Sequence, residues 1–282
     1  MVKVDLHIHT KYSDGVLSLE EVLDDAKKNK ITELSITDHD TIIRLKDYCN
    51  LQKKYKIDII PGVEISTNKK GMHILGYDIT EFDQIEKFMY NLKKINEEKN
   101  IETIDILCKL GLDIDFERVK EMTTLDVITY KDIVKYIVKK GYVDNPHDVY
   151  KKYIGKGAVA YVPSITLDSK KVIELILDSN GIPVLAHPFL IDSNISLEEE
   201  IVDLINYGLE GIETIQPCMT KNQILEYEYY TKKYNLVRTV GSDFHDYRYS
   251  NLGIEVDDFY LDKFHNKIMK KRRVKNGKKT LL

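Results

Sequence analysis

The chain has 282 residues, of which 43% are hydrophobic and 31% are charged, and its formal net charge is −4. These values are typical of a folded globular protein and exclude a disordered or fibrous chain. The small net charge excludes a surface that coats nucleic acid along its whole extent, but it allows a local basic pocket.

The cysteines and the apolar runs give expectations about the compartment. The odd number of cysteines and the absence of CxxC spacing argue against a disulfide framework, so we expect buried free thiols at Cys49, Cys108 and Cys218. No apolar run approaches the roughly 20 residues needed to cross a bilayer, and the first residues have no signal-peptide pattern. The sequence therefore predicts a cytoplasmic protein without a membrane contact.

Short apolar runs alternate with amphipathic helical stretches in the first 80 residues. The run at 2–9 is followed by a helix for which Ser18 is the expected N-cap, and Glu21 completes a capping box. Three further strands are expected in this part of the chain, at 31–39, 56–67 and 73–79.

The pattern changes between about 83 and 162, where helical periods follow one another with no strand signal. The alternation then resumes with three more expected strands, at 181–188, 208–215 and 236–245. Seven strands alternating with helices predict a mostly parallel α/β sheet, and the length favours a closed barrel over an open sheet. We expect a discontinuous barrel domain, residues 1–97 and 163–282, with a helical insertion at 98–162.

Two histidines lie two residues apart in the first expected strand. His7 and His9 therefore share a face with Asp5, opposite Val4, Leu6 and Ile8. A single strand histidine is more often a satisfied core or surface residue than a metal ligand. Burying two imidazoles without partners costs several kcal/mol, however, and a metal ion would satisfy both.

The other expected strands also carry imidazoles and carboxylates near their ends. Together with the first loop, they give nine candidate metal ligands: His7, His9, Asp14, His39, Glu64, His73, His187, Asp243 and His245. The carboxyl ends of parallel barrel strands meet at one mouth, where active sites are built. This donor set suits zinc, manganese or iron, and its lack of cysteine argues against a closed structural zinc site. Nine ligands are too many for one ion and fit two or three, which would leave a pocket that attracts phosphate.

Six stretches resemble the ordered motifs of the PHP (polymerase and histidinol phosphatase) superfamily: DLHIHTKYSDG, TDHDT, PGVEIS, HILGYDI, AHP and GSDFH. The helical insertion and the later stretch YIGKGAVAYVP look most like the TrpH-type metal-dependent phosphoesterases of this superfamily. The resemblance covers nearly the whole chain. It implies a distorted seven-stranded (β/α)7 barrel that binds up to three manganese, iron, zinc or magnesium ions, with the helical insertion capping the active site.

The resemblance also implies how the nine ligands are shared. One metal would be held by His7, His9, Glu64 and Asp243. Glu64 would bridge to a second metal, held by His73 and His187. A third would be held by Asp14, His39 and His245. The sequence itself does not fix this partition.

The implied activity is hydrolysis of phosphate esters of nucleotides. The enzyme would be a 3′,5′-nucleoside bisphosphate 3′-phosphatase, a 5′–3′ exonuclease on short oligonucleotides, or both, and no obligate protein partner is expected. We expect a metal-bridging hydroxide to attack phosphorus, with Glu64 among its metal ligands and His39 or His245 orienting the phosphate. Asp38 is expected either to fix the tautomer of an imidazole or to cap the next helix.

Two alternatives to this activity remain open. One is a histidinol-phosphate phosphatase of the same superfamily. The other is a catalytically silent, metal-stabilised module that binds a partner or nucleic acid through the basic C-terminal run, Lys267 to Lys279, which is otherwise a solvated last helix.

Five basic residues are candidates for holding the rest of a phosphorylated substrate, although basic residues in such positions are more often solvated surface charges: Arg44, Lys69, Lys70, Lys131 and Lys156. The loop lysines are favoured because they follow Glu64 closely in the chain. Lys131 lies in the stretch TYKD, where many TrpH-type relatives have GRPH, so substrate choice is open at this position.

Overall fold

The computed structural model describes residues 1–123, 127–192 and 194–279. They form two compact units, which are described separately below. The first comprises Met1–Glu86 together with the described chain from Leu167 onward, and the second comprises Lys87–Thr166. The sequence placed these boundaries at 97/98 and 162/163. The long helix α3 (Phe82–Lys109) begins in the first unit and ends in the second.

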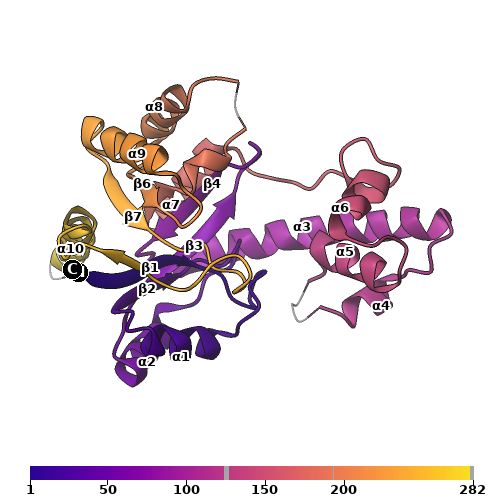
Figure 1. Cartoon of the computed structure of the whole chain (residues 1–282), viewed down its shortest axis with the longest axis horizontal. Helices are drawn as coiled ribbons and strands as arrows, with labels where there is room; N and C mark the ends of the chain where they lie inside the picture. Colours follow the sequence, from indigo (N-terminus) through magenta and orange to yellow (C-terminus); the bar gives the residue numbers. More distant parts are fainter. Residues whose placement is uncertain (124–126, 193, 280–282) are drawn as a thin grey trace. The chain divides into compact units, whose positions relative to one another are not determined.

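The first unit is built on one eight-stranded sheet in the order β7-β6-β5-β4-β3-β2-β1-β8 (Figure 1). Its strands are β1 (Val2–Ile8), β2 (Glu33–Ile36), β3 (Asp58–Ser66), β4 (His73–Tyr77), β5 (Ile182–Leu185), β6 (Gly211–Ile215), β7 (Val237–Val240) and β8 (Ile254–Val256). Neighbouring strands are parallel except that β4 runs antiparallel to β3 and β5, and β8 runs antiparallel to β1. The sheet closes where His9 donates its backbone N–H to the carbonyl of Phe244, after β7 (2.9 Å). The predicted α/β barrel is confirmed, and the short strand β8 is an addition to the seven expected strands.

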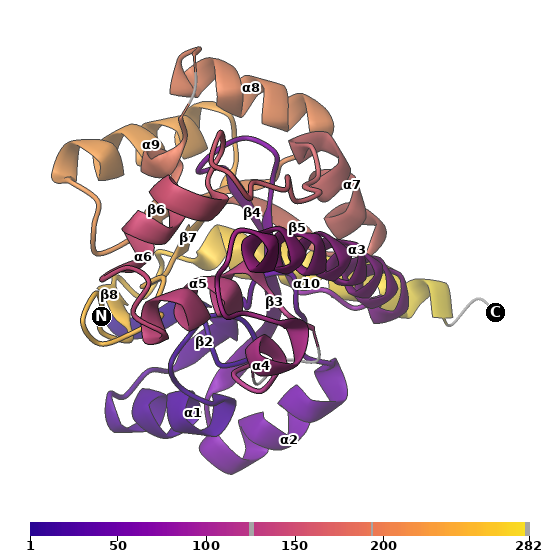
Figure 2. The same ribbon diagram turned by 90° about the vertical axis from the view of Figure 1, so that its right-hand side faces the viewer.

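Among the described residues of the first unit, six helices pack around the barrel. They are α1 (Leu19–Lys28), α2 (Leu45–Tyr55), α7 (Ser169–Asp178), α8 (Leu197–Tyr207), α9 (Lys221–Lys233) and α10 (Asp262–Lys279). Figure 2 shows α1 and α2 together beside β2, and α7, α8 and α9 around β4 to β6. The predicted capping box of α1 is confirmed, because Ser18 and Glu21 exchange side-chain-to-backbone hydrogen bonds. No helix in the described part of the chain is long and apolar enough to span a membrane.

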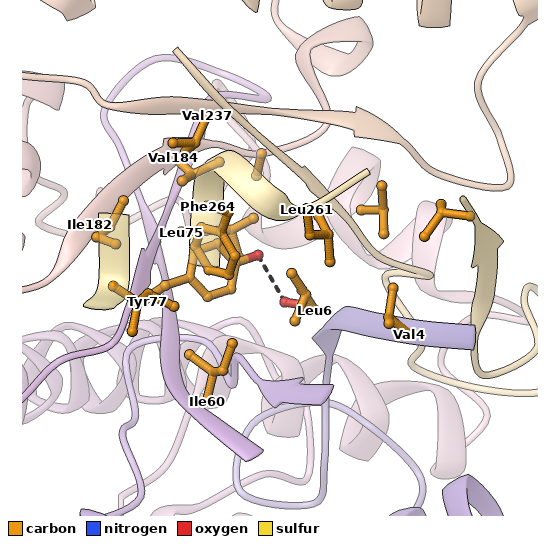
Figure 3. Close-up of a cluster of buried hydrophobic side chains, with 14 residues drawn as sticks. Val4, Leu6, Ile60, Leu75, Tyr77, Ile182, Val184, Val237, Leu261 and Phe264 are labelled. Carbon is orange, nitrogen blue, oxygen red and sulfur yellow. Dashed lines mark hydrogen bonds between the residues drawn. The ribbon is translucent and has the colours of Figure 1, made fainter. Parts of the chain in front are cut away.

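A cluster of buried side chains joins six barrel strands, β1, β3, β4, β5, β7 and β8, to α10 (Figure 3). The ring of Tyr77 packs edge-on against Phe264 with 5.3 Å between centroids, and its hydroxyl donates to the carbonyl of Leu6 (2.8 Å). Leu6 therefore faces this cluster, whereas Ile8 packs in a separate cluster with α1 and α2. The expected single face for these two residues was wrong, because the pairing of β1 with β2 contains a register shift between Asp5 and Ile8.

The second unit is helical in its described residues, as expected. After α3 it contains α4 (Phe116–Lys120), α5 (Tyr130–Lys139), α6 (Pro146–Val149) and a π-helical turn (Tyr150–Ile154). These elements have an apolar core of their own, to which α3 contributes Leu107 and α5 contributes Ile133 and Ile137.

The cysteines differ from the expectation. Cys49, Cys108 and Cys218 are free thiols, as predicted, but all three are exposed rather than buried. Two of them lie on the polar faces of α2 and α3, and the third follows β6 in a turn. In α2 and α3 the other residues decide which helix face is buried, so the hydrophobic character of Cys49 and Cys108 did not bury them.

Candidate metal centre

The barrel mouth gathers the nine predicted ligands. The mouth contains three groups of residues, and within each group the donor atoms lie within 4.8 Å of one another. The groups are His9, Asp14, His39 and His245; His7, His9, Glu64 and Asp243; and His39, Glu64 and His73. The remaining ligand, His187, joins them through its Nε2, which lies 2.8 Å from Glu64 Oε1. Parallel strands end at one edge, and the antiparallel direction of β4 brings its first residue, His73, to the same edge.

The deepest group contains two imidazoles that point at each other. His7 Nε2 and His9 Nε2 are 3.1 Å apart. Glu64 Oε2 lies 3.2 Å from the first nitrogen and 3.1 Å from the second, and Asp243 Oδ1 lies 3.2 Å from His9 Nε2. Donor atoms that share one ion at about 2.1 Å are separated by about 3 Å, so this spacing suits a common divalent cation.

Glu64 occupies the centre of the cluster. Its Oε2 faces His7, His9 and His39, whereas its Oε1 lies 2.9 Å from His73 Nδ1 and 2.8 Å from His187 Nε2. The two oxygens of one carboxylate therefore face two sets of imidazoles. This arrangement is what a carboxylate that bridges two ions requires.

The outer group surrounds Asp14, which lies in the loop after β1. His245 Nε2 is 3.2 Å and His39 Nε2 is 4.0 Å from this carboxylate. The ring of His9 stacks on that of His245 with 4.0 Å between centroids, and its Nδ1 lies 3.6 Å from Asp14. His9 thus faces the inner group with one ring nitrogen and the outer group with the other. The partition implied by the resemblance assigned His9 to one metal only.

Buried polar atoms without partners test whether this set fits metal ions. His9 Nδ1, His39 Nδ1 and Glu64 Oε2 have no hydrogen-bond partner among the described residues. Leaving such atoms buried and unsatisfied costs free energy, and coordination to a divalent cation removes that cost. The residues at the mouth therefore fit divalent metal ions.

The electrostatics keep the carboxylates ionised. Burial alone would raise the pKa of Glu64, but the surrounding imidazoles of His39, His7 and His187 lower it well below its usual range. Burial lowers the pKa of His39 to about 3, so this imidazole is neutral at physiological pH. At His39 an ionised carboxylate therefore lies beside a neutral imidazole, which is the protonation state that metal coordination requires. At His9 burial is outweighed by the hydrogen bonds to Asp243 and Glu64, which raise the pKa to about 9, so metal binding there displaces a proton.

Glu213 is a functional candidate that the sequence reasoning missed. It lies in β6 with no exposed surface, and its Oε1 is 2.9 Å from His7 Nδ1 while its Oε2 accepts from the backbone N–H of His187 (2.8 Å). This bond fixes the proton of His7 on Nδ1 and leaves Nε2 directed at the cluster. The signal in the sequence was an acidic residue inside the apolar run GLEGIETI.

Asp38 has contacts that match neither predicted role. Its carboxylate accepts from the backbone N–H of Thr10 (2.7 Å), from the hydroxyl of Thr10 (2.6 Å) and from that of Ser13 (2.6 Å). The next helix begins at Leu45 with Arg44 at the N-cap position. Asp38 therefore fixes the loop that carries Asp14, and the residue bonded to an imidazole is Glu213.

Comparisons with known proteins identify the family. The PHP domain model matches residues 5–270. The chain belongs to the PHP domain family. A 5′-3′ exoribonuclease of Haemophilus influenzae is 32% identical over 247 residues, which cover 86% of this chain and 90% of that protein. A phosphoribosyl 1,2-cyclic phosphate 1,2-diphosphodiesterase of Eggerthella lenta is 26% identical over 248 residues, which cover 86% of this chain and 93% of that protein.

Other relatives extend the range of activities and support the fold. A 3′,5′-nucleoside bisphosphate phosphatase of Chromobacterium violaceum is 27% identical over 257 residues, which cover 87% of this chain and 88% of that protein. A solved structure of a Chromobacterium violaceum amidohydrolase with bound sulfate superposes with a TM-score of 0.78 at 23% identity, over 95% of this chain and 96% of that one. The PHP barrel is therefore shared by this chain and that structure.

The basic residues predicted to hold substrate lie outside the PHP metal cluster. Lys69 is paired with Glu200, Lys70 lies 2.8 Å from Asp192, and Arg44 lies 3.0 Å from Glu86. Lys131 lies in the first turn of α5 and Lys156 follows the π-helical turn, so both belong to the second unit. Their role in substrate binding stays a prediction.

Proposed function

We propose that this PHP protein is a metal-dependent phosphoesterase that hydrolyses phosphate esters of nucleotides. The observation that carries the proposal is the convergence of nine imidazole and carboxylate side chains around Glu64 at the barrel mouth. The named activities of the relatives support the same class, because all three cleave phosphate esters.

The proposed ligand sets are those that the family resemblance implies, and the contacts of Glu64 and Asp14 support them. His7, His9, Glu64 and Asp243 would hold one ion, His73 and His187 would hold a second with Glu64 between them, and Asp14, His39 and His245 would hold a third, with His9 facing the first and the third set. Manganese, iron or zinc suits this mixture of imidazole and carboxylate, and magnesium is the remaining candidate. Bound divalent ions lower the pKa of a water to about 7 and neutralise charge on phosphoryl oxygens.

The exposure of the side chains sets the direction from which substrate enters. The side chains of His7 and Glu64 are 0% and 1% exposed, whereas those of His39, His73 and His245 are 21%, 26% and 28% exposed. A phosphate therefore approaches the cluster from the side of these three imidazoles. In our proposal His39 and His245 orient the phosphate, and Glu213 keeps His7 in the tautomer that binds metal.

The substrate class is proposed from the relatives. We infer that the chain acts on a 3′,5′-nucleoside bisphosphate, on the 5′ end of short oligonucleotides, or on both, as the Chromobacterium violaceum and Haemophilus influenzae proteins are named to do. Histidinol phosphate is the alternative small substrate that a PHP barrel suggests.

A substrate panel tests the proposal. The manganese-loaded protein is assayed with 3′-phosphoadenosine 5′-phosphate, with a 5′-phosphorylated oligoribonucleotide and with histidinol phosphate. We expect turnover of a nucleotide substrate, loss of that turnover in Glu64→Gln and normal turnover in the control Glu198→Gln, which alters a partly exposed carboxylate outside the cluster. Turnover of histidinol phosphate alone would contradict the nucleotide assignment, and unchanged activity of Glu64→Gln would contradict the site.

A further inference from the structure

The second unit contains a segment that the metal centre does not explain. Residues 150–161 read YKKYIGKGAVAY, with three lysines and three tyrosines but no acidic residue. The side chains of Lys151, Lys152 and Lys156 are exposed. Unlike Lys69 and Lys70, none of these lysines forms an ion pair with a carboxylate in the described part of the chain. Their charges are therefore available to an outside anion.

The backbone folds this segment into one compact turn. The π-helical turn ends where Gly155 donates to the carbonyl of Tyr150 (2.7 Å), and the chain returns where Ala160 donates to the carbonyl of Tyr153 (2.7 Å). A Cβ on Gly155 would lie 2.5 Å from the Tyr150 oxygen, so only glycine fits there. Lys156 follows this glycine and is exposed. Single π-helical turns are frequent at functional sites.

Two tyrosines meet beside these lysines. Tyr130, the first residue of α5, and Tyr150 pack edge-to-face with 6.0 Å between ring centroids. Their side chains nevertheless remain 42% and 39% exposed. Each ring therefore holds the other in place while part of both stays open to solvent, which is a preorganised aromatic surface rather than a core contact.

We propose that Tyr130, Tyr150, Lys151, Lys152 and Lys156 form a binding surface for single-stranded nucleic acid. Bases stack on the two tyrosines and backbone phosphates pair with the three lysines, which is the combination that sequence-tolerant single-strand binding uses. Paired aromatic rings favour this occupant over an acidic peptide, because a peptide of Asp and Glu has no aromatic rings to stack on the tyrosines. The proposal rests on the proposed function only in identifying this strand with an oligonucleotide substrate.

Binding is measured separately from hydrolysis. Full-length protein in EDTA is titrated into a fluorescently labelled oligoribonucleotide of about 12 nucleotides, a length within the usual single-strand site size. Fluorescence anisotropy gives the Kd at several salt concentrations. The variants are Tyr130→Ala/Tyr150→Ala, the conservative Tyr130→Phe/Tyr150→Phe, and the triple alanine variant of Lys151, Lys152 and Lys156. The matched control is the triple alanine variant of three exposed lysines of the first unit, Lys27, Lys53 and Lys232.

The two kinds of contact predict different changes. Loss of both tyrosines weakens binding by about tenfold or more without changing its salt dependence, and the phenylalanine variant binds like the wild type. Loss of the three lysines reduces the slope of log K against log salt by about 2, because each phosphate contact contributes about 0.7. Wild-type affinity in both alanine variants, or an equal loss in the control variant, overturns the proposal.

Turnover of a mononucleotide separates this inference from the proposed function. The Tyr130→Ala/Tyr150→Ala variant should hydrolyse 3′-phosphoadenosine 5′-phosphate at the wild-type rate, because one nucleotide does not span the surface. Oligonucleotide binding by a protein that hydrolyses no phosphate ester would refute the proposed function alone. Hydrolysis with no oligonucleotide binding, or binding of an acidic peptide in place of the oligonucleotide, would refute the surface alone.

Discussion

Replacing Glu213 with glutamine removes one negative charge and keeps the shape of the side chain. Glu213 is fully buried and accepts two hydrogen bonds, one from the His7 ring and one from the His187 backbone. The amide of glutamine can accept at one atom only, so one of these two N–H groups then faces another donor. A buried donor left unsatisfied costs about 1–3 kcal/mol, and each 1.4 kcal/mol is a factor of ten in an equilibrium. We therefore expect Glu213→Gln to weaken metal binding by about 10- to 100-fold.

A competition titration with a chromogenic chelator measures the manganese affinity of Glu213→Gln, and circular dichroism checks its fold. The matched control is Asp78→Asn, which alters another buried carboxylate, one that accepts from Arg272 (2.6 Å) at the opposite end of β4 from His73. The control should unfold at a lower temperature and bind manganese like the wild type. Wild-type manganese affinity in a folded Glu213→Gln protein would refute the assigned role of Glu213.

Three other perturbations test the metal centre and the packing of α10. Removing metals with EDTA should lower the thermal midpoint and manganese should restore it, because ions that bind only the folded state stabilise it; an unchanged midpoint would contradict this. Arg272→Ala should reduce the free energy of unfolding in urea by roughly 1–3 kcal/mol, because the nearly inaccessible carboxylate of Asp78 loses its guanidinium partner; no loss would show that the pair contributes nothing. The hydrogen bond to Glu33 raises the pKa of His265, so this contact stabilises the fold below the ordinary histidine pKa of about 6.5 and is lost as pH rises through the raised value. The difference in thermal midpoint between wild type and His265→Gln should therefore shrink from about pH 5.5 to about pH 9, and a difference that grows would refute the assignment.

The barrel and the convergence of the candidate ligands could be predicted because both follow from local patterns. Alternating strands and helices predict a parallel sheet, and residues at the ends of parallel strands lie at one edge. His39 and Asp243 follow this rule directly. His73 opens its strand and lies at the same edge only because β4 runs antiparallel, a direction that periodicity does not reveal.

What the sequence did not reveal depends on contacts between distant segments. The register shift in β1 changes which cluster Leu6 enters, and no strand pattern marks it. Glu213 contacts His7 across 206 positions of the chain, and Arg272 contacts Asp78 across 194 positions. The basic C-terminal run was expected to be solvated, and Arg272 is exposed, yet it pairs with the buried carboxylate of Asp78 in the barrel. Such pairings are set by the closed sheet rather than by neighbouring residues.

The number of divalent ions bound per chain tests the central claim most directly. Metal-free protein is titrated with manganese, and the bound metal is counted by mass spectrometry after desalting, for the wild type and for Glu64→Gln. The wild type should retain two or three ions per chain. Glu64→Gln should retain at least one ion fewer, because this carboxylate faces two sets of imidazoles. A wild-type protein that binds less than one ion, or a variant that binds as many as the wild type, would contradict a metal centre built around Glu64.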